Sequence, residues 1–184
     1  MMRGKKGLSQ VVTTMIVLVV AVLLAVVVTY YATNVTMVRT EREELHLGKA
    51  QVWVNSTGAV AAFKLQNIGS RDVLLDKLTV RNIEEGWGKV YYYRVPSGFS
   101  FIGDMNLTGY DSLTGNNVTI DGRTYVQSSD DLPLKSGAEL LILIKGPDNI
   151  QIDDIGGIVN IIVFTENANY LTETRIKSAT LQGG

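Results

Sequence analysis

The sequence predicts an α+β protein in which a long N-terminal hydrophobic helix precedes an antiparallel immunoglobulin-like β-sandwich. Two observations support this prediction. Residues 8–38 carry no charged side chain, and from residue 49 onward the chain changes to short apolar runs separated by turn residues. A chain of 184 residues has room for one membrane-length helix and one domain of about 140 residues, which is large enough to bury its own core.

The first seven residues are basic and too polar to join the helix. They include Arg3, Lys5 and Lys6. An excess of positive charge before an apolar span favours a cytoplasmic N-terminus. We therefore expect residues 1–7 to form a leader on the cytoplasmic side, and the β domain to lie on the outer side.

The apolar segment that follows is long enough to cross a bilayer, because about 20 apolar residues at 1.5 Å rise span a hydrocarbon core of about 30 Å. Valine dominates it, but only a helix satisfies its own backbone hydrogen bonds in lipid. The mixed charges from Arg39 to His46 have a spacing that supports continued helix. Gly48 suits a helix C-cap. The predicted helix therefore spans residues 8–48.

Residues 49–184 contain β-type runs bounded by turn residues, and no second helical pattern. The uninterrupted apolar run Leu140–Ile144 predicts a strand that is buried on both faces. Residues 97–137 are rich in Gly, Ser, Asn and Asp and predict hairpins and long loops. Such strand spacing is typical of an antiparallel sandwich. The predicted strand segments are 49–55, 59–67, 73–82, 89–95, 138–146, 156–167 and 170–181.

The composition gives no basis for an enzyme. The sequence has no cysteine and one histidine, His46, which excludes thiolate chemistry and leaves no partner set for zinc or for a Ser/His pair. No Gly-rich loop stands between a strand and a helix. The net charge of −1 does not attract nucleic acid. We expect no catalysis, no cofactor and no nucleic-acid partner.

Two groups of residues have a functional and a structural interpretation. The acidic residues Asp130-Asp131, Asp148 and Asp153-Asp154 supply oxygen ligands of the kind that Ca²⁺ prefers, but they match no ligand-loop spacing, so we expect solvated turn carboxylates and no metal. Aromatic residues either form a sugar-binding or subunit-facing patch or pack in the core, and in strands the core is the usual place. These aromatic residues are Trp53, Trp87 and Tyr91–Tyr93.

Four Asn-X-Ser/Thr sequons occur in the chain. Each is a short pattern with a high chance frequency, and its alternative interpretation is an ordinary turn or strand-edge asparagine. Four of them in one domain that we expect outside the cell raise the expectation of N-glycosylation. The asparagines are Asn34, Asn55, Asn106 and Asn117.

The N-terminal segment resembles the class III signal sequence of archaeal type IV pilin-like proteins, the group that includes adhesive pilins and archaellins. The matching residues are Lys5-Lys6-Gly7, then Leu8-Ser9-Gln10-Val11-Val12-Thr13 and the unbroken apolar helix. The resemblance implies that a prepilin peptidase cuts between Gly7 and Leu8. Bacterial type IV pilins carry Glu where this chain has Val12, so the resemblance is to the archaeal branch. Gln10 departs from the Pro of many archaeal pilins. Residues 64–80 resemble a strand–turn–strand of such β domains.

This resemblance implies a structural subunit of an archaeal type IV pilus-like cell-surface filament, with a role in adhesion. The implied partners are further copies of the chain, the prepilin peptidase, the pilus assembly machinery and, before assembly, the cytoplasmic membrane. Two alternatives remain open. One is an archaellin of a motility filament. The other is a signal-anchored minor pilin or archaellum accessory protein that binds a cell-envelope partner.

The need to bury the apolar helix leads to the same function. A helix that is apolar around its whole circumference must be buried in lipid or in protein. Outside the membrane, a bundle of identical helices hides it, and heterologous contacts that repeat without closing generate a filament. Val19 and Leu23 are four residues apart and share one face of the helix. We predict that both pack against neighbouring subunits in the filament core.

Overall fold

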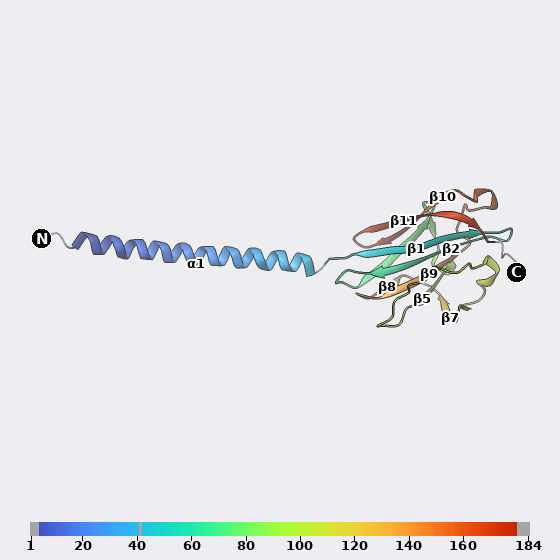
Figure 1. Ribbon diagram of the computed structural model, residues 1–184, viewed down its shortest axis with the longest axis horizontal. Helices are drawn as coiled ribbons and strands as arrows, with labels where there is room; N and C mark the ends of the chain where they lie inside the picture. Colours follow the sequence, from blue (N-terminus) through green and yellow to red (C-terminus); the bar gives the residue numbers. More distant parts are fainter. Residues whose placement is uncertain (1–3, 41, 180–184) are drawn as a thin grey trace. The chain divides into compact units, whose positions relative to one another are not determined.

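The computed structural model describes residues 4–40 and 42–179. Its contacts divide into an N-terminal helical unit, which ends at Arg42, and a β domain, which begins at Glu43. The predicted fold class is confirmed: one long apolar helix precedes a large, mostly antiparallel β domain (Figure 1).

The helix α1 spans Gly4–Thr40, so it begins four residues before the predicted start. The prediction that the leader stays outside the helix is wrong for residues 4–7, while Arg3 lies outside the described residues. Two physical reasons favour the longer helix. The carbonyl groups of residues 4–7 accept hydrogen bonds from amides four residues further on, and lysine is a good helix former.

The helix also ends eight residues earlier than predicted, and strand β1 spans Leu45–Val54. His46 therefore lies exposed in a strand, and Gly48 is not a C-cap but adjoins a bulge at Lys49, whose φ is 56°. Helical charge pairs stabilise by only about 0.2–0.5 kcal/mol each. Burial of Leu45, which is 6% exposed, contributes about 1.5–3 kcal/mol and outweighs them.

The remaining strands follow in short succession. Every predicted strand segment overlaps an observed strand, but β1 begins four residues and β11 one residue before the predicted start. Residues 180–181 of the last segment lie outside the described residues. The short strands β4 and β8 were not predicted. The bounds are β2 Ala59–Asn67, β3 Val73–Val80, β4 Ile83–Glu85, β5 Val90–Arg94, β6 Asn117–Ile120, β7 Arg123–Gln127, β8 Leu132–Leu134, β9 Glu139–Lys145, β10 Ile158–Thr165 and β11 Asn169–Ser178.

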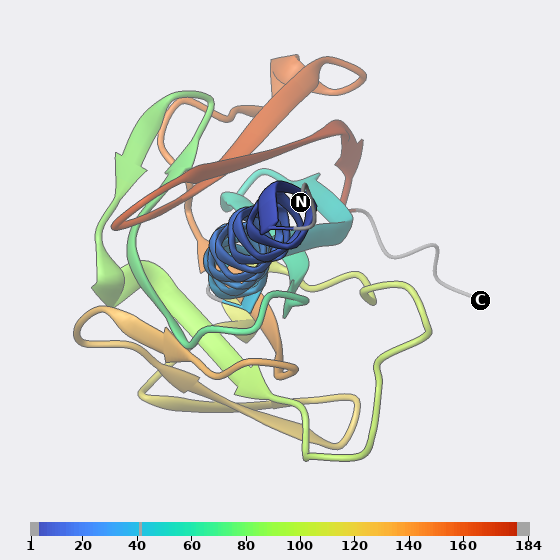
Figure 2. The same ribbon diagram turned by 90° about the vertical axis from the view of Figure 1, so that its left-hand side faces the viewer.

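The strands pair in the order β4-β3-β10-β11-β1-β2-β9-β5-β7-β6, with β8 also on β3. Among the described strands, the only parallel pair is β1 with β11, which places Trp53 opposite Lys177. Figure 2 shows β10 and β11, in dark orange and red, on one side of the domain and the gold β6–β7 hairpin on the opposite side. The first strand, β1, and the last described strand, β11, are therefore hydrogen-bonded neighbours near the middle of the strand order.

The main core lies between the inner faces of the two halves of the sheet. Alternate residues of β2, such as Ala61 and Phe63, point into it together with residues of β3, β9 and β10. This alternation is the two-residue repeat of a strand. Its largest fully buried side chains are Phe63, Leu65, Leu75, Leu78, Leu134, Leu140, Ile142, Ile144 and Ile161.

The outer faces of β2 and β9 are buried as well. The other alternate residues, among them Val60, Leu141 and Leu143, pack in a second cluster with Met105 and Leu113. We call residues 99–113 the covering segment, because it and the β6–β7 hairpin supply much of this second cluster. The predicted double burial of Leu140–Ile144 is therefore confirmed.

Candidate functional site

Between residues 9 and 37, the surface of α1 is predominantly apolar on every side. Residues 9–37 form a helix that is long and apolar enough to cross a membrane. The consecutive residues Val17, Leu18 and Val19 are 62%, 65% and 54% exposed. Successive helical residues point about 100° apart, since one turn holds 3.6 of them. No face of α1 is therefore polar enough to meet water, and the helix needs lipid or protein around it.

Five threonines of α1 are compatible with such dry surroundings. Their hydroxyls donate to the backbone carbonyl groups four residues earlier, at 2.8–2.9 Å. A hydroxyl bonded in this way needs no water and leaves no unpaired donor in an apolar medium. The threonines are Thr13, Thr14, Thr29, Thr33 and Thr36.

A shallow hollow lies on the helix surface at Ala25, bordered by Val22, Val26, Thr29 and Tyr30. The methyl group of Ala25 leaves space that the larger neighbours enclose. Side chains of one helix fit into such hollows on another. Val19 and Leu23, the residues predicted to pack in a filament core, are exposed on the same helix, at 54% and 59%.

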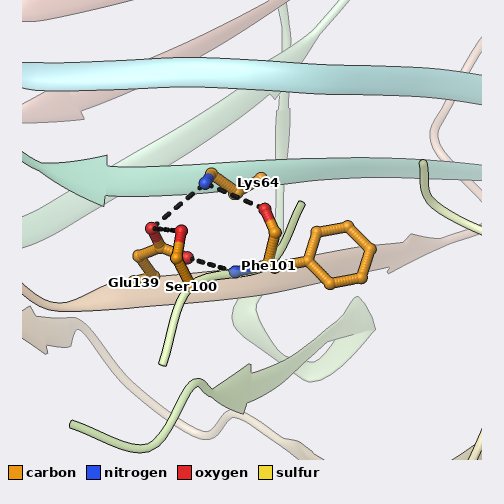
Figure 3. A network of polar contacts seen from close by, with 4 residues as sticks. All are labelled: Lys64, Ser100, Phe101 and Glu139. Carbon is orange, nitrogen blue, oxygen red and sulfur yellow. Dashed lines mark hydrogen bonds and ion pairs between the residues drawn. The ribbon is translucent and has the colours of Figure 1, made fainter. Parts of the chain in front are cut away.

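A network of charged and polar groups fixes the covering segment to the sheet (Figure 3). Lys64 Nζ of β2 lies 3.1 Å from Glu139 Oε1 of β9 and donates to the Phe101 carbonyl at 3.2 Å. The Ser100 hydroxyl and the Phe101 amide donate to Glu139 at 2.7 and 2.9 Å. The Lys64 and Glu139 side chains are 12% and 4% exposed. Buried charge therefore anchors this loop.

The network also sets the protonation of Glu139. Burial acts to raise its pKa, but the hydrogen bonds from the Phe101 amide, the Ser100 hydroxyl and the Lys64 ammonium outweigh burial and hold the pKa below its ordinary value. The carboxylate thus stays charged at neutral pH. Residue spacing does not reveal this pair; its one signal in the sequence is that Lys64 is the only charged residue in the run 59–67.

We predict that the β domain loses stability in acid through Glu139. A carboxyl group with a lowered folded pKa contributes stability above its unfolded pKa of about 4.3, and that contribution is lost as the pH falls through the folded value. Urea unfolding followed by circular dichroism, from about pH 6 to about pH 3, should show this loss. In Glu139→Gln the dependence should be shallower. The matched variant Glu173→Gln, at an exposed residue of β11, should keep the wild-type dependence, and equal curves for all three proteins would contradict the prediction.

The four sequon asparagines lie on four different segments of the chain. Asn34 is exposed on α1, Asn117 is exposed at the start of β6, and Asn106 is exposed in the covering segment. Asn55 is half-buried, and its side-chain oxygen accepts hydrogen bonds from the amides of Thr57 and Gly58 at 3.0 and 2.9 Å. Their glycosylation stays a prediction.

The acidic pairs lie in separate turns with partners of their own. Asp131 accepts a hydrogen bond from the Trp87 indole at 3.0 Å, and Asp154 pairs with Arg81 at 2.9 Å. Asp148 pairs with Lys89 at 2.9 Å. Within residues 4–40 and 42–179, no three potential metal ligands gather. The arrangement supports the interpretation as turn carboxylates.

The aromatic residues pack in the core and form no common patch. Trp53 and Tyr91 are 5% and 3% exposed and belong to the cluster on the outer face of the sheet. Tyr92 points to the inner core, and half-buried Trp87 packs there too. Tyr93 is half-buried and packs against the outer-face cluster. The core interpretation of these aromatics is confirmed.

No protein-family model and no curated protein matches this sequence. The function is therefore inferred from the apolar helix, from the β domain and from the resemblance at residues 5–13.

Proposed function

We propose that the chain is a structural subunit of an archaeal type IV pilus-like filament on the cell surface, with a role in adhesion. In this filament α1 packs against α1 of neighbouring copies, and the β domain forms the outer surface. The observation that carries the proposal is the surface of α1, which is apolar on every side over residues 9–37. A soluble monomer has no way to cover it.

The membrane holds the subunit before assembly. Each large apolar side chain kept out of water contributes roughly 1.5–3 kcal/mol, so lipid retains the unassembled helix firmly. Transfer from lipid into a helix bundle adds no further hydrophobic gain and depends on close packing instead. The hollow at Ala25 and the internally bonded threonines support a helix that changes from lipid to protein surroundings.

We predict that the mature chain starts at Leu8. Cleavage between Gly7 and Leu8 removes Arg3, Lys5 and Lys6, whose charges would be costly to bury in a dry helix bundle. N-terminal sequencing of the chain from its native membrane should therefore read Leu-Ser-Gln. A mature chain that begins at Met1, or beyond Val38, would contradict the assignment as a pilin-like subunit.

Filament formation itself is tested by shearing. Cells that produce the chain should release filaments into the medium under shear, and an antibody to the β domain should label them along their length in the electron microscope. If the chain stays in the membrane fraction and no labelled filament is released, a membrane-anchored monomer explains the helix and the proposed function is wrong.

A further inference from the structure

A cavity of about 470 Å³ opens between the covering segment and the β6–β7 hairpin. Leu143 of β9 and the buried Met105 line it. Polar and aromatic groups complete its wall, most notably Phe101, Arg123 and Tyr125. Cavities of roughly 300–1,000 Å³ that combine an apolar base with a few polar groups are the usual form of small-molecule sites.

The hydroxyl of Tyr125 is an unused hydrogen-bond donor in this cavity. Tyr125 is only 4% exposed, and its ring packs 5.9 Å from that of Tyr93. Across the described residues, no hydrogen-bond partner reaches its hydroxyl. Burial raises the pKa of Tyr125 to about 12, so the hydroxyl keeps its proton at neutral pH. The hydroxyl itself is not sealed from solvent, so it opens into the cavity, where water or a ligand accepts from it.

Arg123 supplies further unused donors beside it. Arg123 and Tyr125 are two residues apart on β7, so their side chains point to the same face of the strand. The guanidinium lies over the Phe101 ring, 5.1 Å from its centre. In the part of the chain that the structure describes, no carboxylate pairs with it. Arginine has five N–H donors in a planar fork that fits a carboxylate.

Hydrogen-bond acceptors lie elsewhere on the cavity wall. Asp121 accepts a hydrogen bond from the Asn106 amide group, and Asp104 pairs with Lys49 at 3.0 Å. Both carboxylates retain free lone pairs that accept from hydroxyl groups. The negative charges of these two carboxylates would repel a phosphate dianion more strongly than a ligand with a single negative charge. A ligand with a single carboxylate and several hydroxyls satisfies donors and acceptors together.

We propose that this cavity binds an acidic sugar, a uronic acid residue of a surface polysaccharide. Its carboxylate accepts from Arg123 and from the Tyr125 hydroxyl, and its ring hydroxyls donate to Asp104 and Asp121. All these groups belong to the β domain. The site is therefore complete in an unassembled subunit, and the proposal does not depend on the proposed assembly of α1.

The test uses the full chain in detergent, produced in a host without N-glycosylation so that Asn106 is unmodified. Calorimetric titration with three uronic acid disaccharides, of gluco, galacto and manno configuration, is compared with titration of the three neutral counterparts. At least one acidic disaccharide should bind about tenfold or more tightly than its neutral counterpart, as expected for a charge-assisted bidentate contact.

Two variants locate the binding. Arg123→Gln should weaken the binding of the acidic disaccharide at least about tenfold. Tyr125→Phe, which keeps the aromatic ring, should weaken it by about threefold to tenfold. The controls Arg175→Gln, exposed on β11, and Tyr92→Phe, outside the cavity, should bind like wild type. Thermal melting verifies that each variant is folded.

Three results would overturn the proposal. The first is the absence of binding by all three acidic disaccharides. The second is equal binding of acidic and neutral sugars. The third is unchanged binding by folded Arg123→Gln. If inorganic phosphate alone binds in an Arg123-dependent manner, the site takes a simple anion and the assignment to a sugar is wrong.

Discussion

Leu23→Ala is expected to leave the subunit in the membrane at wild-type levels while its filaments become fewer, shorter or less heat-stable. Alanine keeps the helix apolar and insertable, so lipid tolerates the change. In a packed bundle the lost side chain leaves a cavity that costs about 2–5 kcal/mol, and the loss is repeated in every subunit. Immunoblots of membrane fractions and electron microscopy of sheared filaments, heated in steps, measure the two effects.

Leu171→Ala in β11 is the matched control. The two leucines are equally exposed in the single chain, at 59% for Leu23 and 57% for Leu171. The same truncation should therefore matter only where assembly buries the side chain. We expect Leu171→Ala to form wild-type filaments. Wild-type membrane levels together with wild-type filaments in Leu23→Ala would mean that α1 is not packed in the way that we propose.

Lys64→Met is expected to destabilise the β domain by about 3 kcal/mol, because removal of one partner leaves the buried charge of Glu139 uncompensated. Methionine retains the apolar stem, so the loss reports on the ammonium group. The covering segment should loosen with it, since Lys64 also bonds the Phe101 carbonyl. Urea unfolding measures the free energy, and chymotrypsin cleavage within residues 99–113 reports on the segment.

A second substitution separates charge from packing. In Lys64→Met/Glu139→Gln the glutamine oxygen still accepts from the Phe101 amide, and its NH2 group donates to the Ser100 hydroxyl oxygen. Part of the stability should therefore return. Lys177→Met, at an exposed residue of β11, should stay within about 0.5 kcal/mol of wild type. If Lys64→Met is no less stable than Lys177→Met, the network does not anchor the covering segment.

The strongly patterned elements were predictable from the sequence. The charge-free run 8–38 could only be a long helix, and the predicted strand 59–67 coincides with β2. Leu140–Ile144 is apolar at every position because both faces of β9 are covered. In each case the local pattern of apolar residues predicts the burial that stabilises the element.

The helix–strand boundary was not predictable from charge spacing alone. Charge pairs between Arg39 and His46 fit a helix, but the alternation Leu45-His46-Leu47 fits a strand equally well. The outcome depends on β2, which pairs with this segment through Leu45 opposite Asn67 and Leu47 opposite Leu65. The local pattern is compatible with a helix and with a strand. Pairing with β2, more than a dozen residues away in the chain, selects the strand.

Strand partners and turn conformations that the local pattern does not specify explain the other differences. The parallel pairing of β1 with β11 places Val52 opposite Ile176. The apolar periodicity of a strand predicts which of its faces is buried, but not the strand with which it pairs. The hairpin between β3 and β4 turns at Arg81-Asn82, both at positive φ, where asparagine is the only sequence signal. The cavity forms where the loop around Phe101 meets Arg123 and Tyr125, which residue spacing does not reveal.

Helical reconstruction of native filaments by electron cryomicroscopy tests the central claim most directly. The proposed function predicts α1 helices of many copies bundled at the filament axis, with Val19 and Leu23 in contact with neighbouring α1 helices, within about 4.5 Å, and β domains on the outside. Filaments in which α1 lies at the periphery, or membranes of producing cells that hold the chain only as a monomer, would contradict it.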